Sequence, residues 1–209
     1  MIYNPNSGKK HISEHLFYPI FEKYDYEIEI IHTEYQGHAQ KIVREIKEVD
    51  LVISAGGDGT YNEVVTGNLE RKKPLLLGNL PIGTVNDVGH MYGYTNNTLK
   101  NLELLLSGTI KTIDVSNINH KIFTYVACFG NFMNIAYETP RMLKKKYGRV
   151  GYLIYGLQAV KDKLKLYDVD YELENIHCSG RYSLIFIVNS DRVAGIKDLF
   201  EDIKLDDGK

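Results

Sequence analysis

Short apolar runs alternate with helical patterns along the first half of the chain. The runs predict strands, and between them apolar residues recur at helical spacing, as at Leu99, Leu102, Leu105 and Leu106. The predicted strands cover residues 1–4, 28–31, 51–54 and 74–80, and the predicted helices cover residues 39–48, 62–69 and 99–106. Strands that alternate with helices are typical of βαβ units, whose parallel sheet is covered on both faces. The first half therefore predicts an α/β domain.

The pattern changes after about residue 108. Val169, Tyr171 and Leu173 alternate with acidic side chains over residues 167–174, which is typical of a half-buried antiparallel strand. A partner strand over 181–188, a turn at 177–180, a further strand over 125–129 and an amphipathic helix within 150–164 complete the pattern. We therefore expect two domains, an α/β domain over residues 1–112 and a mostly antiparallel β domain over residues 113–209.

The last residues of the sequence carry a turn signal. Asp207-Gly208 is a frequent hairpin pair, and only Lys209 follows it. A hairpin turn that leads into no second strand predicts that the β domain is incomplete.

The composition is that of an ordinary globular protein, with 44% apolar and 25% charged residues. The formal net charge of −2 argues against nucleic acid as a partner. No apolar run approaches the roughly 18 residues of a membrane-spanning helix, and the first residues do not resemble a signal peptide. The two cysteines, Cys128 and Cys178, have no metal or redox spacing. These features predict a cytoplasmic protein.

Three glycine-containing turns each follow a predicted strand, at residues 4–9, 56–60 and 81–87. Loops at the carboxyl ends of parallel strands are where open α/β sheets bind ligands, and glycine lets backbone N–H groups approach phosphate oxygens. Neither a Walker sequence nor a GxGxxG sequence occurs. The first turn taken alone is equally well explained as a plain turn. In the second, packing does not explain an acid among glycines, whereas a role as metal or water ligand does.

The motifs NPNSG, SAGGDGTYNEV, PIGTVNDV and KLDDGK together resemble the diacylglycerol kinase catalytic family of soluble bacterial lipid kinases. The resemblance extends over essentially the whole chain. It implies a nucleotide-binding α/β domain of the kind found in NAD kinases, followed by a β-sandwich domain. It also implies ATP as co-substrate and Mg²⁺ as cofactor.

The resemblance carries specific roles to residues of this chain. The nucleotide-binding positions are Asn4, Pro5, Asn6, Ser7, Gly8, Lys9, Thr33, Gly57, Asp58, Gly59, Thr60, Tyr61, Asn62, Glu63 and Thr84. Asp207 matches the Mg²⁺ ligand, together with the backbone carbonyls of Lys204 and Lys209, and Asp58 and Asp87 match acids in a water-linked network to that metal. The family's general base is a Glu beyond the last motif, so we expect it after residue 209. Glu63 is equally well explained as a solvated helix residue, and His32, His38 and Glu138 as surface or capping residues.

The implied reaction is transfer of the γ-phosphoryl group of ATP to a lipid hydroxyl, with diacylglycerol as the first substrate and phosphatidylglycerol or sphingosine-like lipids as alternatives. Two other functions stay open: an NAD kinase, which shares the GGDGT motif, and a non-catalytic nucleotide-binding module. Residues 141–165 hold eight basic residues and one acid. They predict either transient contact with an anionic membrane surface or a solvated face of a helix packed on the sheet. A homodimer is left open.

Overall fold

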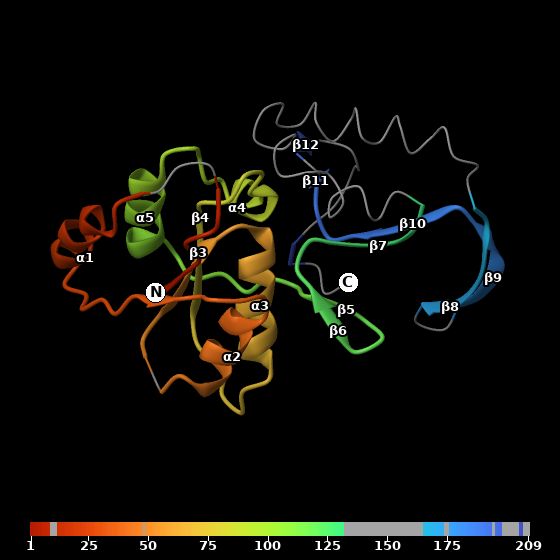
Figure 1. Ribbon diagram of the computed structural model, residues 1–209, viewed down its shortest axis with the longest axis horizontal. Coiled ribbons are helices and arrows are strands. Elements are labelled where there is room, and N and C mark those ends of the chain that lie inside the picture. Colours follow the sequence, from red (N-terminus) through yellow and green to blue (C-terminus); the bar gives the residue numbers. More distant parts are fainter. Residues whose placement is uncertain are drawn as a thin grey trace. The chain divides into compact units, whose positions relative to one another are not determined.

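The computed structural model describes residues 1–8, 12–47, 49–131, 165–173, 176–193, 195–197 and 205–206 (Figure 1). The chain forms two compact units. The first consists of Met1–Tyr125 together with Asn189–Lys209, and the second of Val126–Val188. The first unit thus extends beyond the predicted division at residues 112 and 113 and includes a part of the chain that returns after residue 188.

A four-stranded parallel sheet forms the centre of the first unit. Its strands lie in the order β2-β1-β3-β4, with β1 at Ile2–Tyr3, β2 at Ile31–His32, β3 at Val52–Gly56 and β4 at Leu77–Pro81. Ile2 lies opposite Ile31 on one side and Ser54 on the other. The parallel sheet of the α/β prediction is confirmed, although β2 begins only at Ile31, the last residue of its predicted range.

Helices cover both faces of this sheet, as Figure 1 shows. Successive strand residues point to opposite faces, so Ile2 packs in one core and Tyr3 in the other. The core on the side of Ile2 includes Val43 of α2 (His38–Glu45) and Val64 of α3 (Asp58–Leu69). The core on the side of Tyr3 includes residues of α1 (Tyr18–Lys23) and α5 (Thr98–Ser107). A 3₁₀ turn, η1, at Glu14–Leu16 precedes α1. Two buried cores explain why the strands read as apolar runs and not as alternating patterns.

Short elements that the periodicity does not predict complete the first unit. Helix α4 covers Asp87–Met91, β5 (Ser116–Ile118) and β6 (Lys121–Phe123) form a hairpin, and β11 (Arg192–Val193) pairs with β12 (Ile196–Lys197). The β5–β6 turn consists of Asn119 and His120, both with positive φ. Positive φ at both central residues is the geometry of a type I′ turn, whose twist matches the flanking strands.

Antiparallel strands make up the described part of the second unit. Strand β7 (Val126–Gly130) pairs with β10 (Leu184–Val188), and β8 (Tyr167–Leu173) pairs with β9 (Ile176–Tyr182). The antiparallel character predicted for the later part of the chain is confirmed. The predicted pairing of 167–174 with 181–188 is wrong, because the residues expected to form the turn, 177–180, lie inside β9. The partner of β8 is therefore β9, and Leu184–Val188 pairs with β7.

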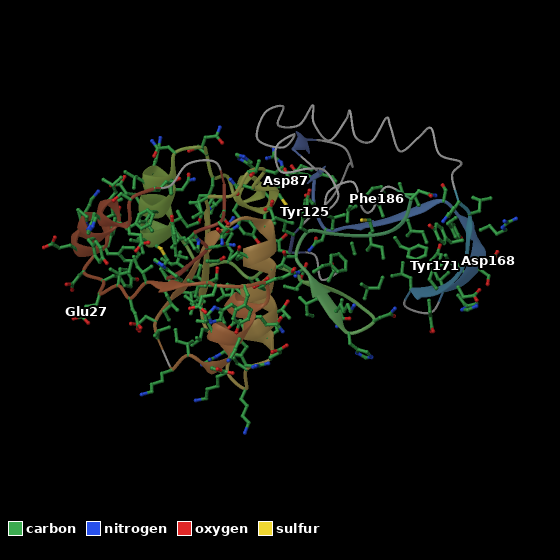
Figure 2. The ribbon with its side chains drawn as sticks, in the orientation of Figure 1. Glu27, Asp87, Tyr125, Asp168, Tyr171 and Phe186 are labelled. Atoms are coloured by element: carbon green, nitrogen blue, oxygen red, sulfur yellow. The ribbon has the colours of Figure 1, made fainter. Side chains whose placement is uncertain are left out.

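One face of the β8–β9 hairpin is apolar and the other is charged. Tyr171 contacts the ring of Tyr182 at a centroid distance of 6.0 Å, whereas Asp168 belongs to the opposite face and lies beside Arg181 (Figure 2). The apolar face is partly buried at Tyr167 and Val169, but Leu173 is 64% exposed. The predicted half-buried strand is thus half-buried only in its first residues.

The helix and the basic segment predicted between 141 and 165 lie outside the described residues, except for Lys165. Glu138 also lies outside them. Within the described part of the chain, no helix is long and apolar enough to span a membrane.

Candidate functional site

Three loops meet at the carboxyl edge of the parallel sheet. The first loop (residues 4–8) follows β1, the second (residues 57–60) follows β3 and includes the first turn of α3, and the third (residues 82–86) follows β4. Backbone hydrogen bonds hold them in register: the N–H of Asn4 donates to the carbonyl of Ala55, and the N–H of Ile82 donates to the carbonyl of Gly56, both over 2.9 Å. The parallel order of the strands therefore brings the three predicted motifs together.

Glycine residues allow the backbone of the third loop to contact the backbone of the other two loops directly. A Cβ atom on Gly83 would lie 2.5 Å from the Cα of Gly57 in the second loop. Gly8 has φ +72°, and a Cβ there would lie 2.1 Å from the carbonyl oxygen of Ile82. Both separations are far below van der Waals contact, so a side chain at either position would push the loops apart.

Asn4 fastens the first loop to α3. Its Nδ2 donates to Oγ1 of Thr60 over 2.9 Å, and its Oδ1 accepts the N–H of Asn6 over 3.0 Å. The carbonyl of Asn4 also accepts the N–H of Ser7. The side chain that the resemblance assigned to nucleotide binding thus shapes the loop, and it leaves the backbone of Asn6 and Ser7 at the surface edge of the sheet.

The N-terminus of α3 lies at the same carboxyl edge of the sheet. Gly57 is the extended residue before the helix, and Asp58, Gly59 and Thr60 form its first turn. The first N–H groups of a helix have no partner within the helix, and together with the helix dipole they favour an anion at this end. Gly59 is exposed, and a Cβ added there would meet nothing within 4 Å. This end of α3 is therefore open to a phosphate group.

The carboxylate of Asp58 caps the next helix along the chain. Its Oδ2 accepts the N–H of Asp87 over 3.1 Å and its Oδ1 accepts the N–H of Val88 over 2.9 Å, so it serves the first two N–H groups of α4. Burial raises the pKa of the Asp58 carboxyl above its ordinary value, and the nearby Asp87 acts in the same direction. The two N–H groups oppose that rise, since they stabilise the charged form.

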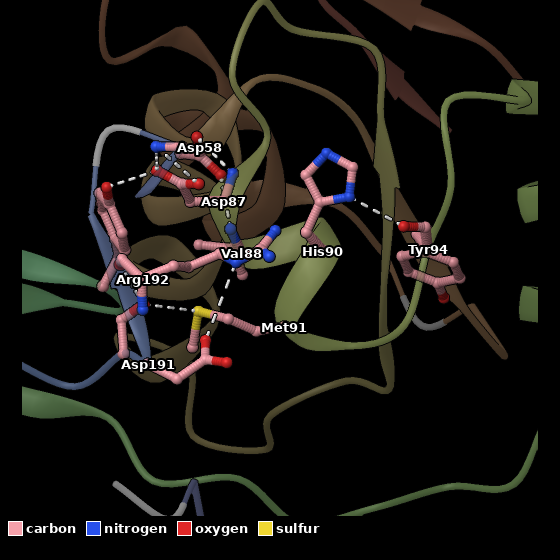
Figure 3. A network of polar contacts seen from close by, with 11 residues as sticks. Asp58, Asp87, Val88, His90, Met91, Tyr94, Asp191 and Arg192 are labelled. Atoms are coloured by element: carbon pink, nitrogen blue, oxygen red, sulfur yellow. Dashed lines mark hydrogen bonds and ion pairs between the residues drawn. The ribbon is translucent and has the colours of Figure 1, made fainter. Parts of the chain in front are cut away.

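The side chain of Asp87 is fully buried, at 0% exposure, and it joins three parts of the chain (Figure 3). Its Oδ2 accepts the hydroxyl of Tyr125 over 2.6 Å. Its Oδ1 and Oδ2 accept the N–H of Gly195 over 3.1 and 2.9 Å. Asp58 and Asp87, the two acids assigned to one network, therefore lie next to each other, linked through the backbone N–H of Asp87.

Three further predicted residues of α3 direct their side chains to structural partners. Tyr61 is buried against Tyr92, with its hydroxyl 3.5 Å from that of Tyr92. Oδ1 of Asn62 accepts the N–H of Thr124 over 3.0 Å, and Oε1 of Glu63 accepts the N–H of Gly37 over 2.8 Å. Contact between these side chains and nucleotide stays a prediction.

The two predicted threonines lie at different depths. Thr33 is buried directly after β2, where its N–H donates to the carbonyl of Tyr3. Thr84 is exposed at the tip of the third loop. Pro5 and Ser7 are partly exposed in the first loop, which also contains the exposed Asn6.

The predicted Mg²⁺ position lies outside the described residues, as do Asp207 and the two residues that share its turn, Lys204 and Lys209. Lys9 is also outside them. In the ranges that are described, no group of three or more His, Cys, Asp or Glu side chains is arranged to hold a metal ion.

Sequence reasoning missed the partners of Asp87. Tyr125 is separated from it by 38 residues and Gly195 by 108, and neither lies in one of the motifs. A single sequence holds no signal for such pairs, because each depends on how distant segments pack.

Comparison with known proteins bears on the family. The sequence model of the diacylglycerol kinase catalytic domain matches residues 1–118. Two proteins named diacylglycerol kinase, from Staphylococcus aureus strains MRSA252 and Newman, are each 35% identical to the chain over 212 residues, which is all of this chain and 67% of theirs. The chain belongs to the diacylglycerol kinase catalytic family. The predicted family and the enzyme class, an ATP-dependent lipid kinase, are thereby confirmed, and the NAD kinase alternative is not favoured.

Solved structures agree on the fold. A diacylglycerol kinase from Bacillus anthracis strain Sterne superposes with a TM-score of 0.78 at 24% identity, covering 99% of this chain and 69% of that protein. A second structure from the same organism has a TM-score of 0.80 at 25% identity, with the same coverage. The predicted fold class, a parallel α/β part with antiparallel strands in the C-terminal part, is confirmed. Kinases of this family use ATP and usually a divalent metal ion.

Proposed function

We propose that the first unit binds ATP with its phosphates over the N-terminus of α3, between the first and third loops, and that the γ-phosphoryl group passes to a hydroxyl of diacylglycerol. The hydroxyl oxygen forms a new bond to the γ-phosphorus while the bond to the β–γ bridging oxygen breaks. ADP leaves, the hydroxyl proton passes to a base, and phosphatidic acid is formed. In such a transfer the protein mainly positions the reactants and stabilises the charge on the phosphate oxygens.

The convergence of the three loops is the observation that carries this proposal. Gly8 and Gly83 bring the loops to backbone distance, and the exposed Gly59 leaves the end of α3 uncovered. Backbone N–H groups at such an edge donate hydrogen bonds directly to phosphate oxygens, without a side chain between them. A loop arrangement that served only as turns would need neither the close approach nor the open helix end.

We also assign Mg²⁺ to the site, held by Asp207 and the carbonyls of Lys204 and Lys209, with Asp58 and Asp87 joined to it through water. The chemistry of the described donors fits, because carboxylate oxygens are the ligands that Mg²⁺ prefers. Among the described residues, the Asp58 carboxylate accepts hydrogen bonds from its own backbone N–H and from those of Asp87 and Val88, and the Asp87 carboxylate accepts them from Tyr125 and Gly195. A carboxylate has about four acceptor sites, so both acids have capacity for a water molecule. When bound, the ion would shield the charge of the phosphates.

The choice of diacylglycerol follows the names of the Staphylococcus aureus relatives. Incubation with labelled ATP and vesicles that contain diacylglycerol, phosphatidylglycerol or a sphingosine-like lipid tests it directly. Labelled phosphatidic acid is the expected product. Label in another lipid, or in NAD offered in place of the vesicles, would contradict the proposed substrate.

Replacement of Gly59 by Ala tests where the phosphates bind. The methyl group meets no protein atom within 4 Å, and Ala is favoured over Gly in a helix by about 1 kcal/mol, so the melting temperature should hold or rise. The same methyl would lie in the path of the phosphates, and we expect ATP affinity in calorimetry to fall by about tenfold or more, which corresponds to about 1.4 kcal/mol.

Lys100→Ala is the matched control, since Lys100 is exposed on α5. It should change neither the melting temperature nor ATP binding. Unchanged ATP affinity in a folded Gly59→Ala protein would contradict the proposal that the phosphates bind at the N-terminus of α3.

A further inference from the structure

We infer that Tyr125 is a positioning residue of the kinase reaction: its hydroxyl holds the buried carboxylate of Asp87 in place and, through Asp87, fastens the returning segment (residues 189–193 and 195–197) to the start of α4. The inference rests on the proposed function, in which Asp87 belongs to the network around the metal and phosphates.

Tyr125 is itself held on both sides along the chain. The residue before it, Thr124, donates its N–H to Oδ1 of Asn62 on α3 over 3.0 Å. The carbonyl of Tyr125 accepts the N–H of Asn189 over 2.9 Å. A backbone fixed in this way delivers the hydroxyl to one place, so little conformational entropy opposes its hydrogen bond to Asp87.

Asp87 is restrained at both ends of the residue. Asp58 accepts its backbone N–H, and the hydroxyl of Tyr125 and the N–H of Gly195 bind its carboxylate. The bond from Tyr125 is short, at 2.6 Å, and its acceptor has 0% exposure. Hydrogen bonds to a carboxylate are about twice as strong as those between neutral groups, and a buried oxygen has no water with which to replace a lost donor.

The returning segment depends on this carboxylate. Gly195 lies between β11 and β12, and its N–H donates to Asp87. A second attachment runs from Oγ of Ser190 to Sδ of Met91 at the end of α4, over 3.1 Å. Figure 3 shows Asp191 and Arg192 of the segment near Met91 of α4. Loss of the Tyr125 hydroxyl would therefore let the Asp87 carboxylate change its orientation. It would also weaken the attachment of the segment at Gly195.

Such a role predicts a particular split between kinetic constants. The nucleotide phosphates contact the three loops in the proposed function, and Tyr125 lies in none of them. A misdirected Asp87 would instead disturb the reacting geometry, where a shift of about 1 Å can cost up to a hundredfold in rate. Loss of the hydroxyl should therefore lower kcat while leaving the KM for ATP nearly unchanged.

Tyr125→Phe is the test, with Tyr92→Phe as its matched control. Tyr92, like Tyr125, is a partly buried tyrosine; its hydroxyl pairs with that of Tyr61, and among the described residues no hydrogen bond joins it to Asp87. For Tyr125→Phe we expect kcat to fall by about tenfold or more, as the loss of a bond to a charged group predicts, with a KM for ATP within about twofold and a raised Mg²⁺ requirement for binding of a non-hydrolysable ATP analogue. Amide exchange at Gly195, followed by NMR, should become faster. Tyr92→Phe should leave these four quantities unchanged.

A double-mutant cycle shows whether Tyr125 acts through Asp87. If it does, Tyr125→Phe should not accelerate Gly195 exchange further in an Asp87→Asn protein. Additive effects of the two substitutions, or wild-type kcat and exchange in Tyr125→Phe, would overturn the inference. The exchange measurement needs no kinase activity, so an inactive parent would count against the proposed function and leave this test intact.

Discussion

At the scale of single residues, Asp58 combines burial with a capping role. Its carboxylate accepts the N–H groups of Asp87 and Val88 and so begins α4, although it belongs to α3. Burial nevertheless outweighs those two bonds and raises its pKa. An acid held in this way is less stable when charged than it would be in water, which is a common property of functional carboxylates.

The raised pKa of Asp58 predicts a pH dependence of stability. The folded protein keeps a proton that the unfolded chain has already released above the ordinary Asp pKa of about 3.9. The stability that this carboxyl contributes is therefore complete below that pH and is lost as the pH rises through the folded value. Asp58→Asn cannot ionise, so the difference between its melting temperature and that of the parent should grow as the pH rises above about 4.

Thermal unfolding of both proteins in a chelating buffer measures this difference. The chelator keeps metal binding from stabilising either protein. Loss of an acceptor for the N–H groups of α4 would lower the melting temperature of Asp58→Asn by a similar amount at every pH. A difference that does not change with pH would therefore contradict a raised pKa for Asp58.

At the scale of elements, α3 has an open end and two side chains that hold its neighbours. Gly59 and Thr60 lie at the end toward the loops, while Asn62 and Glu63, one turn later, bind the chain at Thr124 and Gly37. The tight crossing of α2 over α3 also needs Gly67, where a Cβ would lie 2.2 Å from the carbonyl oxygen of Gln40. One helix therefore sets both the site and the position of α2.

Glu63 predicts a defined loss of stability at the start of α2. Its Oε1 accepts the N–H of Gly37, which precedes that helix with a φ of +86°. Removal of a carboxylate at a helix N-terminus costs about 1 kcal/mol. Glu63→Ala should therefore lower the free energy of unfolding in urea by about that amount, and Glu63→Gln, which keeps an acceptor oxygen, by less. Equal losses in the two variants would show that this hydrogen bond does not stabilise the helix.

The strand pairing of the second unit differs from the pairing that the sequence predicts for residues 167–174. Strand β9 has His177, Ser179 and Arg181 on its polar face, and the small residues Cys178 and Gly180 lie at the centre of its other face between Ile176 and Tyr182. Small residues at the centre make the apolar pattern of β9 weak, because glycine is depleted in strands. Leu184–Val188 has the stronger apolar run, but it pairs with β7. The pairing of a strand depends on all competing partners, whereas the pattern reports only its own residues.

At the scale of the whole molecule, charge is distributed unevenly along a nearly neutral chain. Residues 141–165 carry eight basic residues and one acid, while the total is −2. We propose that this segment contacts anionic membranes, where each basic residue near the surface contributes about 1 kcal/mol. Reversal of charge at Lys144, Lys145 and Lys146 to Glu should weaken co-sedimentation with anionic vesicles, and high salt should weaken that of the parent.

Neutral vesicles and a variant with charges reversed elsewhere are the controls. Lys72 and Lys73, which lie between α3 and β4, allow reversal of two neighbouring charges outside the basic segment. That variant should sediment like the parent under every condition. If the variant with reversed charges at Lys144, Lys145 and Lys146 sediments with anionic vesicles as much as the parent does, the segment is not the membrane-binding surface.

The sequence by itself determined the parallel α/β class, the three loops and the family. Each of these features is local: apolar runs, helical spacing and glycines next to strand ends lie within a few residues of one another. The loops meet because parallel strands end at one edge, which is a rule of topology and needs no coordinates. Asn4, Asp58, Thr60 and Gly83 therefore lie at the edge of the sheet that the sequence predicts for them.

Only the tertiary structure decided what those residues contact. It directed Asn62 and Glu63 to distant backbone N–H groups, and it joined Asp87 to Tyr125 and Gly195. It also returned the chain after residue 188 to the first unit and paired β8 with β9. These contacts join segments tens of residues apart, and their free energy depends on burial and on the exact placement of both partners. A linear pattern contains neither quantity, so these contacts follow from packing alone.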